Sequence, residues 1–529
     1  MATNSPRFSG RRRPRILIHF PTVSYFGAVL RVAKAIVAND IGDAILYAAT
    51  RFPGYDELKV QADAAGVKML CLRGADLKPI RDFKVPIAEL GLSVADHSRS
   101  RKTIDVLRAQ EHPLFARRLA LTRKYAAAEW AATYGEQHKY WLNQHAAMAN
   151  HADRIIDALG IDLFITCNET LNYNAHVFIA AMRAIGRRSL YVPLSVPSVN
   201  EMDGWLAKDE EAHITDRCQR IVARLFPRWV RNVNGQRLLR APVGRILAME
   251  GDGMAPREPW LSFTLGSDAV GISSSFLMDR LAEIGAAYRR DSMFLIGSPE
   301  DTEIDREPAR AARLRSEIAE QFGWQQDKPI VLFSPSADLT RQYAIPEFAS
   351  YHELLDYWAR SFKQLRNFNV LISPHPWFQI NEPARKVLEA TGVAILWRKA
   401  ADLIPAVDVF ATFGASSTPR LAASMGLPVL NYLCFDARFL PEDNHSYFVG
   451  FDTMPVARTR AEWEALLDEI DTSAYYSDLR QRAQTRAPFF GVQDGAFVAR
   501  LACLVETLTS GNGPLSEDEI AQLKTRLAN

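Results

Sequence analysis

The stretch from Asp408 to Pro419 reads Asp-Val-Phe-Ala-Thr-Phe-Gly-Ala-Ser-Ser-Thr-Pro, an apolar strand that runs into a polar turn. The turn opens directly into a helix from Pro419 to Met425, which Gly426 closes. Hydroxyl residues just before a helix and proline at its first position form a strong start signal. The backbone N–H groups and the positive dipole end of such a helix attract an anion. This stretch therefore predicts an α/β fold with an anion site at the end of a strand.

A second polar turn lies upstream, where the apolar residues Leu371 and Ile372 pass into Ser373-Pro374-His375-Pro376. The two prolines fix the backbone on either side of His375. Its imidazole could rest against a carbonyl beneath the turn. It could also hold a phosphate, as an imidazolium or as a neutral donor, and stabilise negative charge on a leaving group.

Four polar loops of this kind follow predicted strands in the second half of the chain; the other two begin at Gly297 and at Ser334. The carboxyl ends of parallel strands meet at one edge of a sheet, where ligands bind. Hydroxyl groups and backbone N–H groups suit phosphate oxygens. We therefore predict a nucleotide site formed by Gly297, Ser334, Ser336, His375, Pro376, Ser416, Ser417 and Thr418.

Short apolar runs alternate with helical stretches along most of the chain. They lie at 15–20, 44–48, 67–72, 161–167 and 188–194, and then at 293–296, 329–333, 369–372, 393–396, 409–412 and 428–432. This alternation predicts βαβ units and parallel sheets. With 529 residues the chain is too long for one ordinary core. We predict two Rossmann-like, doubly wound domains, residues 14–260 and 261–460, facing each other across a cleft.

Helical segments interrupt and end this pattern. Residues 98–158 are rich in Ala, Arg, Gln, Trp and Tyr and hold almost no Gly or Pro, which predicts a helical insertion in the first domain. Residues 461–529 have helical character throughout, and we expect them to pack back across the first domain. Residues 1–13 combine Arg with Ser, Gly and Pro, which predicts a disordered basic tail.

The overall charge argues against nucleic acid as a partner, because a net charge of +2 lacks the basic excess of dedicated binders. The exception is a cluster of arginines in the first fifteen residues, at positions 7, 11, 12, 13 and 15. A basic residue near an anionic membrane contributes only about 1 kcal/mol. The tail is therefore either simply solvated or a weak peripheral contact with the inner face of the cell membrane.

Three further features predict a cytoplasmic protein. No apolar run reaches the roughly 18 residues that a membrane span needs. No apolar signal-peptide core follows the basic start of the chain. The cysteines are scattered, as is usual for reduced thiols.

Two residues of the first domain are the main candidates for proton transfer, and the acidic segment that begins at Glu201 is a third. His19 ends the first predicted strand, and Glu169 follows a later one at the start of a helix. Either could take a proton from an attacking hydroxyl group. Glu169 could instead complement a helix dipole, and His19 could be an ordinary buried histidine.

Several chemistries lack their sequence patterns. The phosphate loop Gly-x-x-x-x-Gly-Lys-Ser/Thr and the dinucleotide pattern Gly-x-Gly-x-x-Gly after a strand are both absent. No cluster of His, Cys and carboxylates has the spacing of metal ligands. We therefore expect a reaction that uses neither a metal ion nor a cofactor.

The run from Ala401 to Leu430 resembles the donor half of GT-B glycosyltransferases. The His-Pro pair at 375–376, followed by the Ser-Ser-Thr at 416–418, is similar to bacterial sialyltransferases, Kdo transferases and CDP-glycerol polymer transferases. The resemblance implies that this histidine and these hydroxyl groups hold the nucleotide phosphate. Arg420 and Leu421 stand where GT-B enzymes that use UDP- or GDP-sugars often have an acidic ribose ligand.

The resemblance implies a metal-independent glycosyltransferase that moves a sugar from a CMP-, CDP- or UDP-linked donor to a hydroxyl acceptor on a glycan or glycolipid. Glu169 or His19 would deprotonate the acceptor, and His375 would stabilise the departing phosphate. The loop that begins at Gly297 also resembles UDP-sugar 2-epimerases, which are the first alternative. A non-catalytic nucleotide-sugar-binding protein is the second.

Overall fold

The computed structural model describes residues 12–21, 23–48, 54–71, 103–108, 113–169, 171, 175–194, 206–207, 209–233, 235–261, 266–298, 308–336, 338, 340, 344–375, 378, 381–413, 418–435, 450–492 and 494–528. The chain divides into two compact units. The first holds residues 1–273, 278–300 and 496–529, and the second holds residues 274–277 and 301–495. Each unit has its own parallel sheet, so the predicted α/β fold of two Rossmann-like units is confirmed.

The first unit is built on a seven-stranded sheet, and the strand order reverses between β1 and β4. Successive residues of β1 point to opposite faces. Ile16 and Ile18 therefore enter one hydrophobic core, while Leu17 enters the other. In spatial order the strands are β3 (Lys68–Cys71), β2 (Asp43–Ala48), β1 (Arg15–Phe20), β4 (Leu163–Thr166), β5 (Arg188–Tyr191), β8 (Ala269–Ile272) and β9 (Met293–Leu295).

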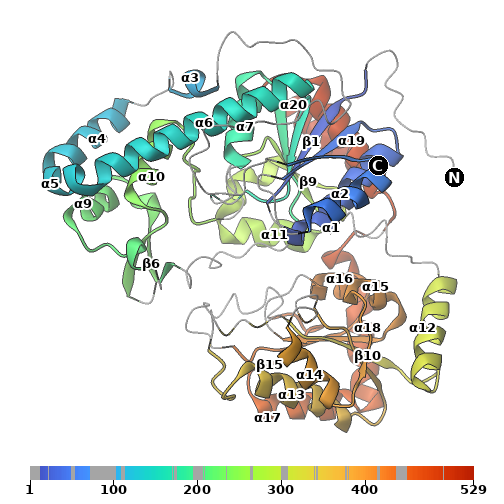
Figure 1. Ribbon diagram of the computed structural model, residues 1–529. Helices are drawn as coiled ribbons and strands as arrows, with labels where there is room; N and C mark the ends of the chain where they lie inside the picture. Colours follow the sequence, from blue (N-terminus) through green and yellow to red (C-terminus); the bar gives the residue numbers. More distant parts are fainter. Residues whose placement is uncertain are drawn as a thin grey trace. The chain divides into compact units, whose positions relative to one another are not determined.

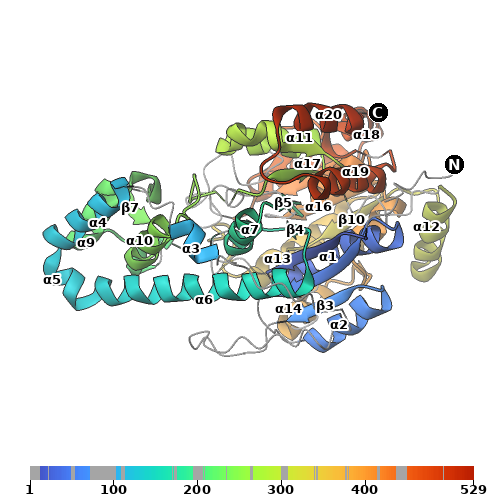
Figure 2. The same ribbon diagram turned by 90° about the horizontal axis from the view of Figure 1, so that it is seen from above.

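Helices cover both faces of this sheet (Figures 1 and 2). The core around Ile16 and Ile18 is completed by α1 (Val23–Ala38), α2 (Tyr55–Ala64), α19 (Phe497–Ser510) and α20 (Glu517–Ala528). The opposite core receives α6 (Gly135–Leu159) and α7 (Ala175–Ala184). The last two helices of the chain are therefore part of the first unit's core.

A helical arm extends from the first unit, well away from the sheet (Figures 1 and 2). Its helical part confirms the predicted insertion, and a later segment that includes an antiparallel hairpin, β6 with β7, packs against it. The hairpin was not predicted. The arm consists of α4 (Pro113–Tyr125), α5 (Ala127–Glu129), the π-helical η2 (Trp130–Tyr134), the first half of α6, α9 (Arg217–Leu225), β6 (Val230–Val233), β7 (Gln236–Leu239) and α10 (Val243–Gly251).

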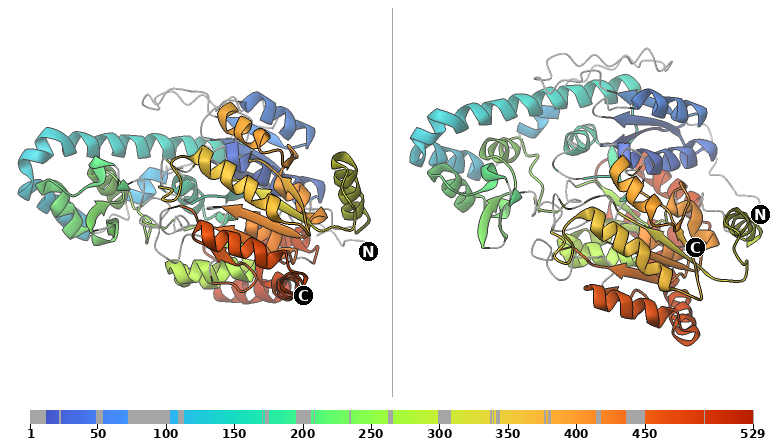
Figure 3. Two further views of the ribbon diagram at one scale, coloured as in Figure 1. Left: turned by 90° about the horizontal axis from the view of Figure 1, so that it is seen from below. Right: turned by 60° about the horizontal axis from the view of Figure 1, so that its bottom comes forward.

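The second unit is built on a six-stranded parallel sheet (Figure 3). Its strand order reverses between β10 and β13, the two central strands. One face carries α13 (Tyr351–Ser361), α14 (Glu382–Ala390) and α17 (Arg460–Ile470). In spatial order the strands are β12 (Ala394–Ile395), β11 (Asn369–Ile372), β10 (Ile330–Ser334), β13 (Val409–Phe413), β14 (Val429–Tyr432) and β15 (Val456–Ala457).

The chain passes between the two units at positions other than those predicted. The boundary predicted at 260/261 would leave β8 and β9 in the second domain, whereas both strands pair within the first unit's sheet. The return to the first unit, expected from residue 461, begins at Ala496, because α17 and α18 (Ser473–Phe490) belong to the second unit.

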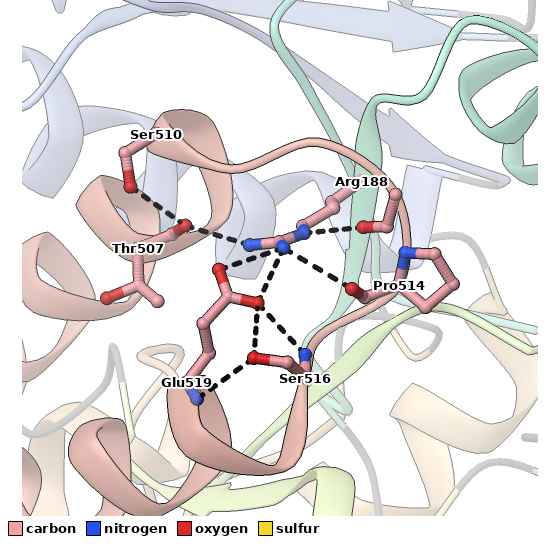
Figure 4. Close-up of polar contacts among 7 residues, drawn as sticks. Arg188, Thr507, Ser510, Pro514, Ser516 and Glu519 are labelled. Carbon is pink, nitrogen blue, oxygen red and sulfur yellow. Dashed lines mark hydrogen bonds and ion pairs between the residues drawn. The ribbon is translucent and has the colours of Figure 1, made fainter.

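A buried arginine ties the returning helices to the first sheet (Figure 4). Arg188, at the start of β5, is almost fully buried and forms an ion pair with Glu519 of α20 at 2.8 Å. It also donates hydrogen bonds to the carbonyl oxygens of Gly513 at 2.7 Å and Thr507 at 3.1 Å. Gly513 has a φ of 73°, a conformation that favours glycine, and its N–H binds the carbonyl of Gly186 at 2.7 Å.

The arginines at the start of the described chain are held by the first unit. Arg12 contacts Asp162 at 3.1 Å, Arg13 pairs with Asp40, and Arg15 donates to the carbonyl of Leu159 at 2.8 Å. These three cations are therefore engaged with the protein itself. Residues 1–11 of the predicted disordered tail, which include Arg7 and Arg11, lie outside the described residues.

Membrane spans were searched for in the described part of the chain. None of the helices found there is long and apolar enough to cross a bilayer.

Candidate functional site

The candidate site of the second unit lies where β10 and β13 end side by side. Ser334 is the last residue of β10, and its carbonyl accepts a hydrogen bond from the hydroxyl of Thr412 on β13 at 3.3 Å. In open parallel sheets, ligands bind at the carboxyl ends of the strands where the strand order reverses. The half-buried Ser334 therefore stands at the position where this fold is expected to bind a ligand.

His375 follows β11, the neighbour of β10 on the other side. The turn that carries it is fixed below by Ser373, whose N–H binds the carbonyl of Phe333 at 2.8 Å. The hydroxyl of Ser373 donates to the carbonyl of Arg398 at 2.7 Å, so this serine is structural. The side chain of His375 is exposed, although enough protein surrounds the ring to lower its pKa from 6.5. At neutral pH the imidazole is therefore an uncharged donor.

The loop after β10 is held from one side by α13. The hydroxyl of Tyr351 donates to the carbonyl of Ser336 at 2.6 Å. Asp338 accepts hydrogen bonds from the N–H of Thr340 at 2.8 Å and from its hydroxyl at 2.5 Å. These contacts hold the described residues of the loop, Ser336, Asp338 and Thr340.

The helix after β13 is α16 (Thr418–Ser424), which begins at Thr418. Arg420, in its first turn, is buried and donates to the carbonyl of Phe490 at 3.2 Å. This arginine is therefore committed to packing against the end of α18. Pro376, Ser416 and Ser417 lie outside the described residues.

Gly297 does not belong to this edge, contrary to the prediction. It follows β9 in the sheet of the first unit, and its N–H binds the carbonyl of Ile272 on β8 at 3.2 Å. The prediction failed because a strand and a polar loop in sequence do not reveal which sheet the strand joins.

The corresponding position in the first unit, between β1 and β4, holds His19. Its Nδ1 lies 3.3 Å from the hydroxyl of Thr166, its partner in the strand register. Burial is nearly complete and lowers the pKa of the ring to about 4. The ring lies among Tyr47 and Phe164 in the core, so the structure favours the interpretation of His19 as an ordinary buried residue.

Glu169 is fully enclosed in the first unit, 0% exposed. One carboxylate oxygen accepts from Arg289 at 2.7 Å and the other accepts from the backbone N–H of Ser267 at 3.0 Å. A general base must reach the proton that it removes. Because both oxygens are engaged inside the protein, the geometry does not support Glu169 as the base and favours a structural role.

Sequence reasoning missed an exposed group beside the turn of His375. Trp397, Arg398 and Lys399 follow β12, and all three side chains are exposed, the indole by 39%. The hydrogen bond from Ser373 to the carbonyl of Arg398 fixes this segment next to the turn. An apolar ring beside two cations after a predicted strand was the signal that could have identified it. Within the described residues, no group of three or more His, Cys, Asp or Glu side chains is arranged to hold a metal ion.

No family model matches the sequence, and no curated protein matches it. Solved structures do match. The UDP-GlcNAc 2-epimerase from Neisseria meningitidis bound to UDP-GlcNAc has a TM-score of 0.46 and 12% identity over 94% of this chain and 100% of that one. The calicheamicin glycosyltransferase CalG4 has a TM-score of 0.49 and 14% identity over 94% and 99%. The wall teichoic acid polymerase TagF, as an H548A variant, has a TM-score of 0.46 and 10% identity over 94% and 90%.

At these identities and TM-scores, the likenesses carry no information on donor, acceptor or reaction. The solved structures similar to this chain include GT-B glycosyltransferases and a UDP-sugar 2-epimerase. These are also the two enzyme classes that its sequence resembles.

Proposed function

We propose that this protein is a metal-independent glycosyltransferase. It would move a sugar from a CMP-, CDP- or UDP-linked donor to a hydroxyl acceptor in surface polysaccharide or glycoconjugate synthesis. One observation carries the proposal. Ser334, His375 and Thr418 follow or end three neighbouring strands, β10, β11 and β13, at the edge where the strand order of the second unit reverses.

Each of these residues has a role in the proposal that its chemistry allows. The neutral imidazole of His375 donates a hydrogen bond to the phosphate, and this bond strengthens as charge builds on the leaving group. The hydroxyl groups of Ser334 and Thr418 donate to other phosphate oxygens. Ser336 lies in the same loop as Ser334. The exposed indole of Trp397 offers a flat apolar surface for the base.

The buried state of Arg420 bears on the donor. Its side chain is directed at the carbonyl of Phe490, so the first turn of α16 presents no carboxylate to a ribose. Because GT-B enzymes that use UDP- or GDP-sugars often have an acidic residue at this position, its absence favours a cytidine nucleotide over a uridine nucleotide as the donor. The proposal assigns proton transfer from the acceptor to neither Glu169 nor His19, because both are enclosed in the first unit's core.

A UDP-sugar 2-epimerase is the second candidate function. The resemblance of this chain to such epimerases rests on the loop at Gly297. That loop belongs to the sheet of the first unit. The glycosyltransferase is the function that uses the residues gathered in the second unit.

The test is incubation of the purified protein with a panel of CMP-, CDP- and UDP-sugars. Slow hydrolysis of one donor supports a transferase, interconversion of the sugar would identify an epimerase, and binding without turnover would identify a binding protein. For the responsive donor, His375→Ala should lower the hydrolysis rate by about 100-fold or more, as loss of one such donor does elsewhere.

His352→Ala is the matched control, since His352 is an exposed histidine on α13 of the same unit. It should hydrolyse the donor at the unaltered rate. Hydrolysis by His375→Ala at that same rate would show that His375 does not hold the phosphate.

A further inference from the structure

The outer end of the arm carries a strongly cationic surface formed by two helices. On α4, Phe115, Leu119 and Thr122 face inward, whereas Arg117 and Lys124 point outward. The rings of Phe115 and Phe226 lie 6.4 Å apart, which places α4 against the end of α9. We call this region the arm-tip surface; it comprises Arg117, Arg118, Arg123 and Lys124 of α4, Arg217, Arg220 and Arg224 of α9, and the flanking Leu114 and Tyr125.

The outward face of α9 consists of arginine. Cys218 and Val222 are buried one turn apart, and Arg217, Arg220 and Arg224 are exposed on the other side. Residues spaced by three and four positions share a helix face. The helix is held firmly by its cap, because Asp216 accepts from the N–H of Gln219 at 2.7 Å. The three guanidinium groups are therefore carried on one face of a firmly capped helix.

The cations of the arm-tip surface are not neutralised by the residues that the structure describes. None of them forms an ion pair with another residue of the described ranges. Two of the nearby carboxylates are engaged elsewhere. Asp216 accepts from the hydroxyl of Tyr134 besides capping α9, and Glu250 binds Arg228 at 2.7 Å. The positive charge is therefore presented to solvent.

Apolar groups flank this charge. Leu114 and Tyr125 are 50% and 48% exposed, and their spacing puts them on the same side of α4 as Arg118. A face of arginine and lysine flanked by leucine and aromatic side chains is typical of helices that lie in a membrane interface. The whole chain carries only +2, so the charge is local to this surface.

We propose that the arm-tip surface binds an anionic lipid bilayer. Its guanidinium and ammonium groups would contact the lipid phosphates, while Leu114 and Tyr125 enter the headgroup layer. Charge complementarity favours an anionic partner. The exposed apolar side chains and the absence of a chain-wide basic excess favour a bilayer over nucleic acid. This inference goes beyond the proposed transferase activity and does not depend on it.

The test is sedimentation of the full chain with vesicles. The protein should sediment with vesicles of phosphatidylcholine that contain about 30% phosphatidylglycerol and not with pure phosphatidylcholine, and about 0.5 M salt should release it. The variant Arg217→Glu/Arg220→Glu/Arg224→Glu should bind about 100-fold more weakly, given the contribution of each basic residue near such a surface. A second variant on the other helix, Arg117→Glu/Lys124→Glu, should weaken binding in the same direction.

The matched control is Arg313→Glu/Lys363→Glu/Arg366→Glu, which makes the same charge change with exposed residues of the second unit. It should bind anionic vesicles as the unmodified chain does, and circular dichroism should show every variant folded. Equal loss in this control would reduce the effect to overall charge and overturn the proposal. So would binding to neutral vesicles, no binding to either vesicle, or a preference for duplex DNA over anionic vesicles.

Discussion

The carboxylate of Glu169 contacts the guanidinium of Arg289 at 2.7 Å, and the two side chains are 0% and 6% exposed. Removing one partner of a buried ion pair leaves the other charge uncompensated, which destabilises a protein by about 3–5 kcal/mol. We predict that Glu169→Gln lowers the free energy of unfolding by this amount and leaves the kcat of the folded protein nearly unchanged. Chemical denaturation and donor turnover, measured on the same samples, check both parts.

Glu211→Gln is the control for that experiment, because Glu211 is an exposed carboxylate of the same unit. It should change neither quantity. If Glu169→Gln instead kept full stability and lost turnover by orders of magnitude, Glu169 would be the general base after all.

The same residue shows where sequence reasoning ends. The position of Glu169 after a strand was readable, because apolar runs and polar turns have local signatures. Its partner Arg289 lies 120 positions away and no pattern connects them. Ser334 and His375 could be grouped because the strands before them are recognisable in the sequence as short apolar runs. The membership of Gly297 in the other sheet depends on long-range strand pairing, which the sequence does not show.

At the scale of elements, α19 and α20 complete the core of the first unit through the contacts of Arg188. This arginine is 1% exposed and binds carbonyls at the end of α19, as well as Glu519. We predict that Arg188→Met destabilises the first unit by about 3 kcal/mol, since it leaves buried carbonyls and a carboxylate without their donor. Hydrogen exchange should accelerate most in α20.

Arg187→Met is the matched control, because the side chain of Arg187 is 35% exposed and pairs with Asp162 at 3.4 Å. It should change exchange in α20 little, as partly exposed pairs contribute little. Equal acceleration in the two variants would contradict the assigned role of Arg188.

The strands show the same division between local and long-range information. The predicted runs at 15–20 and 369–372 coincide with β1 and β11, because each is a short apolar segment bounded by turns. The hairpin of β6 and β7 was missed, since Arg231, Asn232, Gln236 and Arg237 hide any alternation of apolar residues. Its pairing is set by packing within the arm, which composition does not reveal.

For the whole molecule, buried histidines make the first unit sensitive to acid. Burial lowers the pKa of His19 and His138 to about 4 and that of His151 to about 3, and it holds the pKa of His176 well below 6.5. In the unfolded chain these rings bind a proton near pH 6.5. Between pH 6.5 and 4 the unfolded state therefore binds more protons than the folded state, and the free energy of unfolding falls as the pH falls.

A shift from 6.5 to about 4 corresponds to about 3 kcal/mol for one ring, so several such rings are enough to unfold a domain of ordinary stability. We predict that the first unit unfolds between pH 6.5 and 4 while the second unit stays folded, because its described histidines, His352 and His375, are exposed. Hydrogen exchange at stepped pH values, resolved by segment, distinguishes the two units. His176→Phe supplies the decisive comparison, since neither ring nitrogen of His176 has a hydrogen-bond partner and the variant removes one titrating group without breaking a hydrogen bond. The variant should show a shallower loss of stability with acid than the unmodified chain, and an identical slope would mean that His176 does not contribute to this loss.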